Sequence, residues 1–118
     1  MSALLTPEQV AEAMSERDLQ ESVRQLCRAL DLPYYHTHDA RRSPEGWPDC
    51  AIVAADTLIL RELKTMTGKP TPAQLRWLDA LSRCTRIDAG IWRPTSWTDG
   101  TIEAALRGRN GGRQLPAG

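Results

Sequence analysis

The chain has 118 residues, no net formal charge at neutral pH, and ordinary globular proportions of apolar (41%) and charged (25%) residues. This length suits one domain with a single core, and no apolar run reaches the ~20 residues of a membrane span. Zero net charge argues against a uniformly basic nucleic-acid binder. No basic region followed by an apolar run marks the N-terminus, so we expect a cytoplasmic protein without membrane association. The cysteines lack the spacing of a zinc site, which favours reduced, buried thiols.

Two capping-box patterns predict helix starts in the first part of the chain. Thr6-Pro7-Glu8-Gln9 predicts a short helix over 6–13, with proline at its first position. Ser15 begins a second helix, which ends near Asp31, ahead of Pro33. The apolar stripe of this second helix consists of Leu19, Val23, Leu26 and Leu30.

Three strands are expected next. The alternation in 34–38 predicts the first, and the polar segment 39–47 reads as a loop. The apolar runs 50–54 and 57–63 predict the second and third strands, over 50–54 and 57–64, joined by a turn at 55–56.

The second half repeats the capping-box signal and adds one strand. Thr71-Pro72-Ala73-Gln74 opens a helix whose expected buried stripe is Leu75, Leu78 and Leu81. A strand over 86–92 ends at Pro94, and a last helix is expected within 99–106. We expect one domain over 1–106 with a core of about 15–97, and a disordered, Gly- and Arg-rich tail over 107–118. The order α-β-β-β-α-β predicts an α/β (α+β) fold with a sheet flanked by helices.

The hairpin carries the clearest chemical signal. A two-residue turn at 55–56 pairs Asp49 directly with Glu62, with their Cβ atoms ~5 Å apart on one face. Lys64 follows on that face after one pleat repeat. Two facing carboxylates repel unless a proton or a cation lies between them, and oxygen ligands suit Mg²⁺ or Mn²⁺. The alternative is a surface hairpin with a Glu/Lys pair and a turn aspartate, although unpaired charges on an apolar face are costly.

Five segments together resemble one nuclease family. They are Gly46-Trp47-Pro48-Asp49, Arg61-Glu62-Leu63-Lys64, Gly68-Lys69, Gln74-Leu75-Arg76-Trp77-Leu78 and Trp92-Arg93-Pro94. This ordered set, within about 15–97, resembles the VRR-NUC group of the PD-(D/E)XK nuclease superfamily, whose small stand-alone members are common in phages and bacteria. Holliday junction resolvases share that core. The resemblance implies a restriction-endonuclease-like fold with a central mixed sheet, and Mg²⁺-dependent DNA cleavage.

The same resemblance implies roles for individual residues. Asp49 and Glu62 would be metal ligands, the backbone carbonyl of Leu63 an additional ligand, and Lys64 the catalytic lysine. It also implies a glutamate on the first core helix. Glu16 lies about 50° from the centre of the apolar stripe and Glu21 about 170° away, which favours Glu16, although a first-turn acid is also favoured by the helix dipole.

Further residues have two interpretations each. Gln74 either faces the active centre, as the resemblance implies, or only completes the capping box with Thr71. A second group of residues also has two interpretations. Its members either contact DNA phosphates or form a charged cluster that faces solvent. This group consists of Arg41, Arg42, Ser43, Lys69 and Arg76.

The sequence thus predicts a metal-dependent DNA endonuclease, with branched DNA such as a Holliday junction among its candidate substrates. Cutting a junction needs two centres, so a homodimer is expected in that case. The alternatives are a catalytically idle DNA-binding or assembly subunit of the same fold, and a nuclease acting on flap, nicked or RNA substrates. The absence of a phosphate-binding loop excludes a built-in ATPase.

Overall fold

A computed structural model describes residues 4–37 and 44–108 of the chain. The elements in order are α1 (Pro7–Ala13), α2 (Glu16–Ala29), β1 (Tyr34–His36), β2 (Cys50–Ala54), β3 (Thr57–Leu63), α3 (Pro72–Ser82), β4 (Ile87–Trp92), α4 (Pro94–Thr98) and α5 (Thr101–Arg107). Across these described ranges, no helix has the length and apolar character needed to cross a membrane.

The helix starts follow the predicted capping boxes. Thr6, Ser15 and Thr71 each accept a hydrogen bond from the backbone N–H three residues later, and that residue's side chain bonds back to the cap. Each reciprocal pair satisfies two backbone donors that the first turn of a helix would otherwise leave unpaired. Local sequence therefore fixes where α1, α2 and α3 begin.

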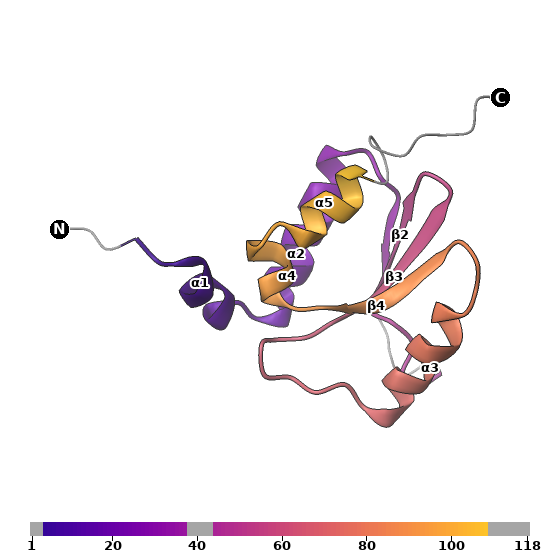
Figure 1. Cartoon of the computed structure of the whole chain (residues 1–118). Coiled ribbons are helices and arrows are strands. Elements are labelled where there is room, and N and C mark those ends of the chain that lie inside the picture. Colours follow the sequence, from indigo (N-terminus) through magenta and orange to yellow (C-terminus); the bar gives the residue numbers. More distant parts are fainter. Residues whose placement is uncertain (1–3, 38–43, 109–118) are drawn as a thin grey trace.

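The four strands form one mixed sheet in the order β1-β2-β3-β4. The first three are antiparallel neighbours, and β4 runs parallel to β3. Cys50 pairs with Arg61 at one end of the β2–β3 hairpin and Ala54 with Thr57 at the turn, which confirms the predicted register. Helices α2, α4 and α5 cover one face of the sheet and α3 the other (Figure 1).

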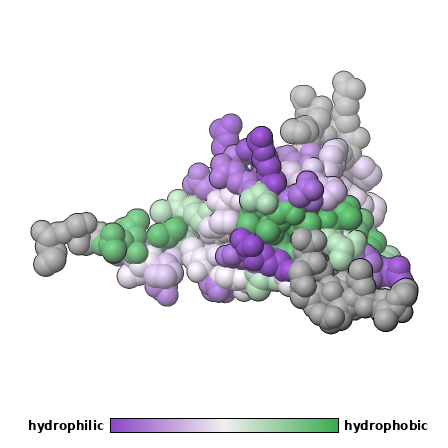
Figure 2. Space-filling view, turned by 90° about the horizontal axis from the view of Figure 1, so that it is seen from above, coloured by the Kyte–Doolittle hydropathy of each residue, from purple (hydrophilic) through white to green (hydrophobic). Residues whose placement is uncertain are grey.

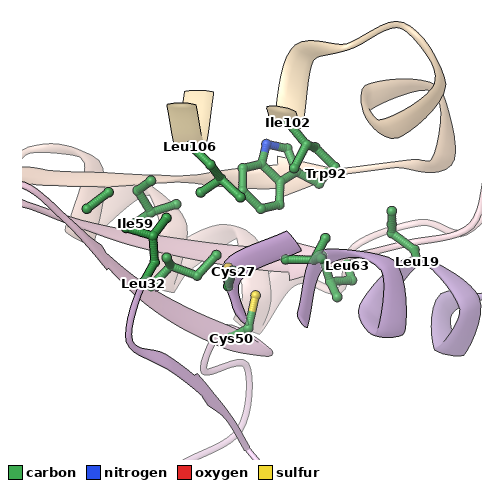
Figure 3. Packing of buried hydrophobic residues seen from close by; sticks show 12 residues of the cluster. Leu19, Cys27, Leu32, Cys50, Ile59, Leu63, Trp92, Ile102 and Leu106 are labelled. Atoms are coloured by element: carbon green, nitrogen blue, oxygen red, sulfur yellow. The ribbon is translucent and has the colours of Figure 1, made fainter. Parts of the chain in front are cut away.

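The main core lies between the sheet and the helices α2 and α5. Trp92 from β4 packs among Ile102 and Leu106 of α5, while Leu19 and Cys27 approach from α2 (Figure 3). Both α5 residues are fully buried. The C-terminal helix α5 therefore contributes to the hydrophobic core together with α2 and β4.

Two sequence predictions need correction, and one short helix was not predicted. Pro94 ends the strand but also begins the short helix α4, at a position where its missing N–H costs nothing. Cys84 is exposed, whereas Cys27 and Cys50 are buried free thiols as expected. Leu75 is 50% exposed and not part of a buried stripe. The inward stripe of α3 runs through Gln74, Leu78 and Leu81, which leaves Leu75 about 100° away around the helix.

The described segment before α1, from residue 4 onward, projects from the body of the molecule as an arm with apolar side chains (Figure 2). Leu4 and Leu5 are 89% and 63% exposed on this arm. It lies on the side of α1, away from the helix α3 that covers the other face of the sheet (Figure 1).

Candidate active site

Asp49 and Glu62 lie opposite each other at the end of the β2–β3 hairpin. Asp49 directly precedes β2, and the register that pairs Cys50 with Arg61 places Glu62 across from it. The Asp49 carboxylate accepts a hydrogen bond from the Leu63 N–H at 2.8 Å. Its backbone carbonyl accepts another from the Thr37 N–H at 2.9 Å. Asp49 is thus held from both neighbouring strands.

Glu62 is almost completely buried, with 2% of its surface exposed. Its Oε2 accepts a hydrogen bond from Gln74 Nε2 at 2.8 Å and lies 3.2 Å from Lys64 Nζ. Its Oε1 is buried and has no hydrogen-bond partner within the described residues. We refer to Asp49, Glu62, Lys64 and Gln74 as the carboxylate centre.

Burial makes the charged form of Glu62 unfavourable. Loss of solvation, followed by the nearby negative charge of Asp49, raises the pKa of Glu62 to about 7, although Lys64 acts in the opposite direction. A buried carboxylate with one unpaired oxygen is costly in the ionised form. A bound cation would remove both the repulsion and the unpaired oxygen.

Gln74 makes both of the contacts that the sequence offered as alternatives. Its Oε1 accepts a hydrogen bond from the Thr71 N–H at 2.8 Å, and its Nε2 donates to Glu62 at 2.8 Å. One amide therefore caps α3 and contacts the buried glutamate at the same time. This ties the start of α3 to the carboxylate centre.

The donors at this centre fit a hard divalent cation. Asp49 and Glu62 offer carboxylate oxygens, and the Leu63 carbonyl lies between Glu62 and Lys64 on the chain. In the described parts of the chain, no three His, Cys, Asp or Glu side chains gather into a ligand set. Mg²⁺ commonly binds through one or two carboxylates and keeps several waters, so two carboxylates are sufficient for it.

The structure does not bring Glu16 into a three-carboxylate group with Asp49 and Glu62. Glu16 is the exposed first residue of α2, and its role at the centre stays a prediction. The competing candidate, Glu21, is exposed and bonds Arg24 and Gln25 on its own helix. This pairing lowers the pKa of Glu21 to about 2.

The candidate DNA-contacting residues separate into two groups. Arg41, Arg42 and Ser43 lie outside the described residues. Lys69 is exposed in the loop between β3 and α3, and Arg76 is exposed on α3, one turn or less beyond Gln74. Both therefore lie on chain segments that adjoin the carboxylate centre.

Sequence reasoning assigned no role to Arg93, which organises the loop that follows Lys64. Its guanidinium donates to the carbonyl oxygens of Thr65 and Gly68, each at 2.7 Å. Arg93 directly follows β4, next to the end of β3. The sequence indicates its role only through the order Trp-Arg-Pro after a predicted strand. The loop from Lys64 to α3 is thereby fixed at its base.

Gly46 allows the segment before Asp49 to approach α3. Its φ is +93°, and a Cβ there would lie 2.5 Å from the Ala73 carbonyl carbon. Only glycine tolerates both the backbone conformation and this distance. At this contact, the segment just before Asp49 packs against the first turn of α3, which carries Gln74.

The arrangement of strands and helices has counterparts among solved structures. One, described as "VRR_NUC domain", has 18% sequence identity and a TM-score of 0.62, over 76% of this chain and 97% of its own. Another, described as "VRR_NUC domain protein", has 19% identity and a TM-score of 0.62, over 81% of this chain and 90% of its own. No family model and no curated protein matches the sequence. The chain therefore has the fold of the VRR_NUC domain, as its sequence resemblance implies.

Proposed function

We propose that this protein is a metal-dependent nuclease that hydrolyses phosphodiester bonds in DNA. One observation carries the proposal: two carboxylates face each other at the end of the hairpin, one of them buried with an unpaired oxygen and a lysine at 3.2 Å. A purely structural ion pair between Glu62 and Lys64 would not need Asp49. A second carboxylate beside Glu62 only makes its ionised form less favourable. The similarity of the fold to a structure described as "VRR_NUC domain" supports the proposal.

Mg²⁺ or Mn²⁺ is the proposed cofactor, held by Asp49, Glu62 and the backbone carbonyl of Leu63. When bound, such an ion polarises a phosphate oxygen and lowers the pKa of a coordinated water. Lys64 supplies a positive charge and N–H donors for the charge that develops on the phosphate oxygens. Gln74 keeps the Glu62 carboxylate in one orientation through its 2.8 Å hydrogen bond.

The surrounding residues have proposed roles in DNA binding. Lys69, Arg76 and the group Arg41, Arg42 and Ser43 would contact backbone phosphates, which position a nucleic acid without reading its sequence. Glu16 is proposed to act as the acid contributed by the first core helix. Branched DNA such as a Holliday junction is one proposed substrate, and two centres in a homodimer would be required to cut it symmetrically.

A cleavage assay tests the proposal. Purified protein is incubated with labelled four-way junction, flap, nicked duplex, linear duplex, single-stranded DNA and RNA, in Mg²⁺, Mn²⁺ or EDTA. We expect cleavage of DNA with either metal and none in EDTA. Glu62→Gln preserves shape but removes the charge and should reduce the rate about 100-fold or more, since metal-bound charge stabilisation contributes several kcal/mol.

The matched control is Glu103→Gln. Glu103 is an exposed glutamate of α5 that bonds Arg107, on the opposite side of the sheet from α3. This variant should cleave at the wild-type rate. The proposal fails if the wild type cleaves nothing with any metal, or if Glu62→Gln cleaves as fast as Glu103→Gln.

A second pair of variants tests the helix glutamate. We expect Glu16→Ala to abolish cleavage and Glu21→Ala to leave it intact. The reverse result would show that the other helix face points to the centre.

A further inference from the structure

A pocket of about 320 Å³ lies on α3, the helix that carries Gln74 at its start. Among the described residues, Arg76, Trp77 and Ala80 line it. It therefore combines an indole surface and a cation with a small side chain that leaves room between helix turns. Its size is at the lower end of the range for small-molecule sites.

The indole of Trp77 is held in a fixed orientation. Its Nε1–H donates to the Glu45 carbonyl at 3.1 Å. Its ring contacts that of Trp47 in an edge-to-face arrangement, with centroids 5.0 Å apart and planes at 85°. A ring fixed on two sides loses little conformational freedom when a ligand binds, which favours a binding surface.

The pocket is close to the place where the scissile phosphate would bind. Trp77 follows Gln74 by three residues on α3, so the two side chains are neighbours on the helix surface, with an axial rise of ~4.5 Å. Gln74 in turn contacts Glu62 at 2.8 Å. A strand bound at the carboxylate centre can therefore reach the pocket with an adjacent nucleotide.

The pocket chemistry favours a nucleobase over an aliphatic ligand. Flat aromatic rings stack on indole, and single-stranded nucleic acids bind proteins through aromatic side chains flanked by basic residues. Arg76 is exposed and forms no ion pair within residues 4–37 and 44–108, so its charge is available to a phosphate or to the ring face. A base inside a duplex has both faces covered by its neighbours, so only an unpaired base can enter such a pocket.

We propose that Arg76, Trp77 and Ala80 bind an unpaired nucleobase of the DNA strand that enters the carboxylate centre. This assignment rests on the proposed nuclease function and narrows its substrate to DNA that has an unpaired nucleotide beside the cleaved bond. Trp77 provides the stacking surface, Ala80 leaves the space, and Arg76 supplies the charge.

Binding in EDTA tests the assignment without requiring cleavage. Fluorescence anisotropy is used to compare a blunt duplex with the same duplex carrying a short unpaired extension. The wild type should bind the extended duplex about 5- to 150-fold more tightly, the range expected when one base stacks on an aromatic side chain. Trp77→Leu should bind the two duplexes with equal affinity, whereas Trp77→Phe, which keeps a stacking ring, should retain the preference for the extended duplex.

Ala80→Leu places a larger side chain in the pocket and keeps the Trp77 ring, and it should also abolish the preference for the extended duplex. Ala80 is exposed on a helix and leucine is a good helix former, so this variant keeps the fold. Ala104→Leu, on the exposed side of α5, is the matched control and should keep the wild-type ratio. Thermal melts of each variant confirm folding.

The outcomes separate the two proposals. Equal binding of both duplexes by the wild type, or an unchanged ratio in Ala80→Leu and Trp77→Leu, overturns the pocket assignment even where the protein cleaves DNA. The opposite outcome is also possible. If the wild type prefers the extended duplex, these variants lose that preference, and the wild type cleaves nothing, the result supports the pocket assignment and refutes the nuclease function.

Discussion

Stability without metal should depend on pH through Glu62. The pKa of this buried carboxyl rises from 4.5 to about 7, first because of burial and then because of Asp49. The native state therefore holds a proton that the unfolded state releases between these values, so stability is lost as pH rises through this window. At ~1.4 kcal/mol for each pH unit, the ionised carboxylate costs the metal-free fold about 3 kcal/mol above pH 7.

Glu62→Gln isolates this contribution because its amide has the same shape and no charge to titrate. Below pH 4.5 the protonated wild type and the variant should have similar stability, whereas at pH 8 the variant should be more stable by about 3 kcal/mol. Urea unfolding in EDTA at a series of pH values, followed by tryptophan fluorescence, measures the difference directly. Mg²⁺ added at pH 8 should stabilise the wild type and leave the variant unchanged.

Two results would refute this reasoning. One is a constant difference between the wild type and Glu62→Gln across the whole pH range. The other is a similar pH-dependent difference for Glu103→Gln, an exposed glutamate that has no carboxylate opposite it. Either would mean that the burial of Glu62 does not control its ionisation.

Three further predictions concern the framework of the site. Gln74→Ala should lower both the cleavage rate and the stability of the fold. The control Gln9→Ala removes the equivalent capping contact in α1 and should lower stability only, by about 1 kcal/mol. Equal cleavage by the two variants would contradict the role of the Gln74–Glu62 hydrogen bond. Arg93→Ala should destabilise the fold by about 2–3 kcal/mol in urea unfolding and reduce cleavage, because it removes charged hydrogen bonds to the loop after Lys64; unchanged values would contradict this. Gly46→Ala should cost more unfolding free energy than Gly100→Ala, since both have positive φ but only Gly46 contacts other backbone atoms; equal costs would show that the approach to α3 is not tight.

The hairpin register could be predicted from the sequence because its determinants are local. Two apolar runs separated by a two-residue turn fix which residues face each other. The structure confirms that pairing down to Cys50 and Arg61. Asp49 and Glu62 follow directly, and Lys64 returns to the same side after one pleat.

The inward stripe of α3 was predicted correctly at Leu78 but not at its first position, because a polar residue occupies that position. Gln74 lies on the inward face, where its amide is satisfied by Thr71 and Glu62. An apolar pattern alone selects Leu75 instead, which the structure leaves exposed. Polar residues that occupy inward-facing positions break the periodicity from which burial is inferred.

Arg93 was missed for a different reason. Its hydrogen bonds join β4 to a loop about 25 residues earlier in the chain, at Thr65 and Gly68. No local pattern predicts which carbonyl groups a loop arginine reaches. Only the parallel pairing of β3 with β4 brings these segments together.

Metal binding is the most direct test of the central claim that Asp49 and Glu62 hold a divalent cation. Free Mn²⁺ is measured by electron paramagnetic resonance as protein is added, at pH 8 and without DNA. The wild type should remove Mn²⁺ from solution, Mg²⁺ should compete, and Asp49→Asn and Glu62→Gln should each weaken binding at least tenfold. Equal Mn²⁺ binding by the wild type and both variants would contradict the claim.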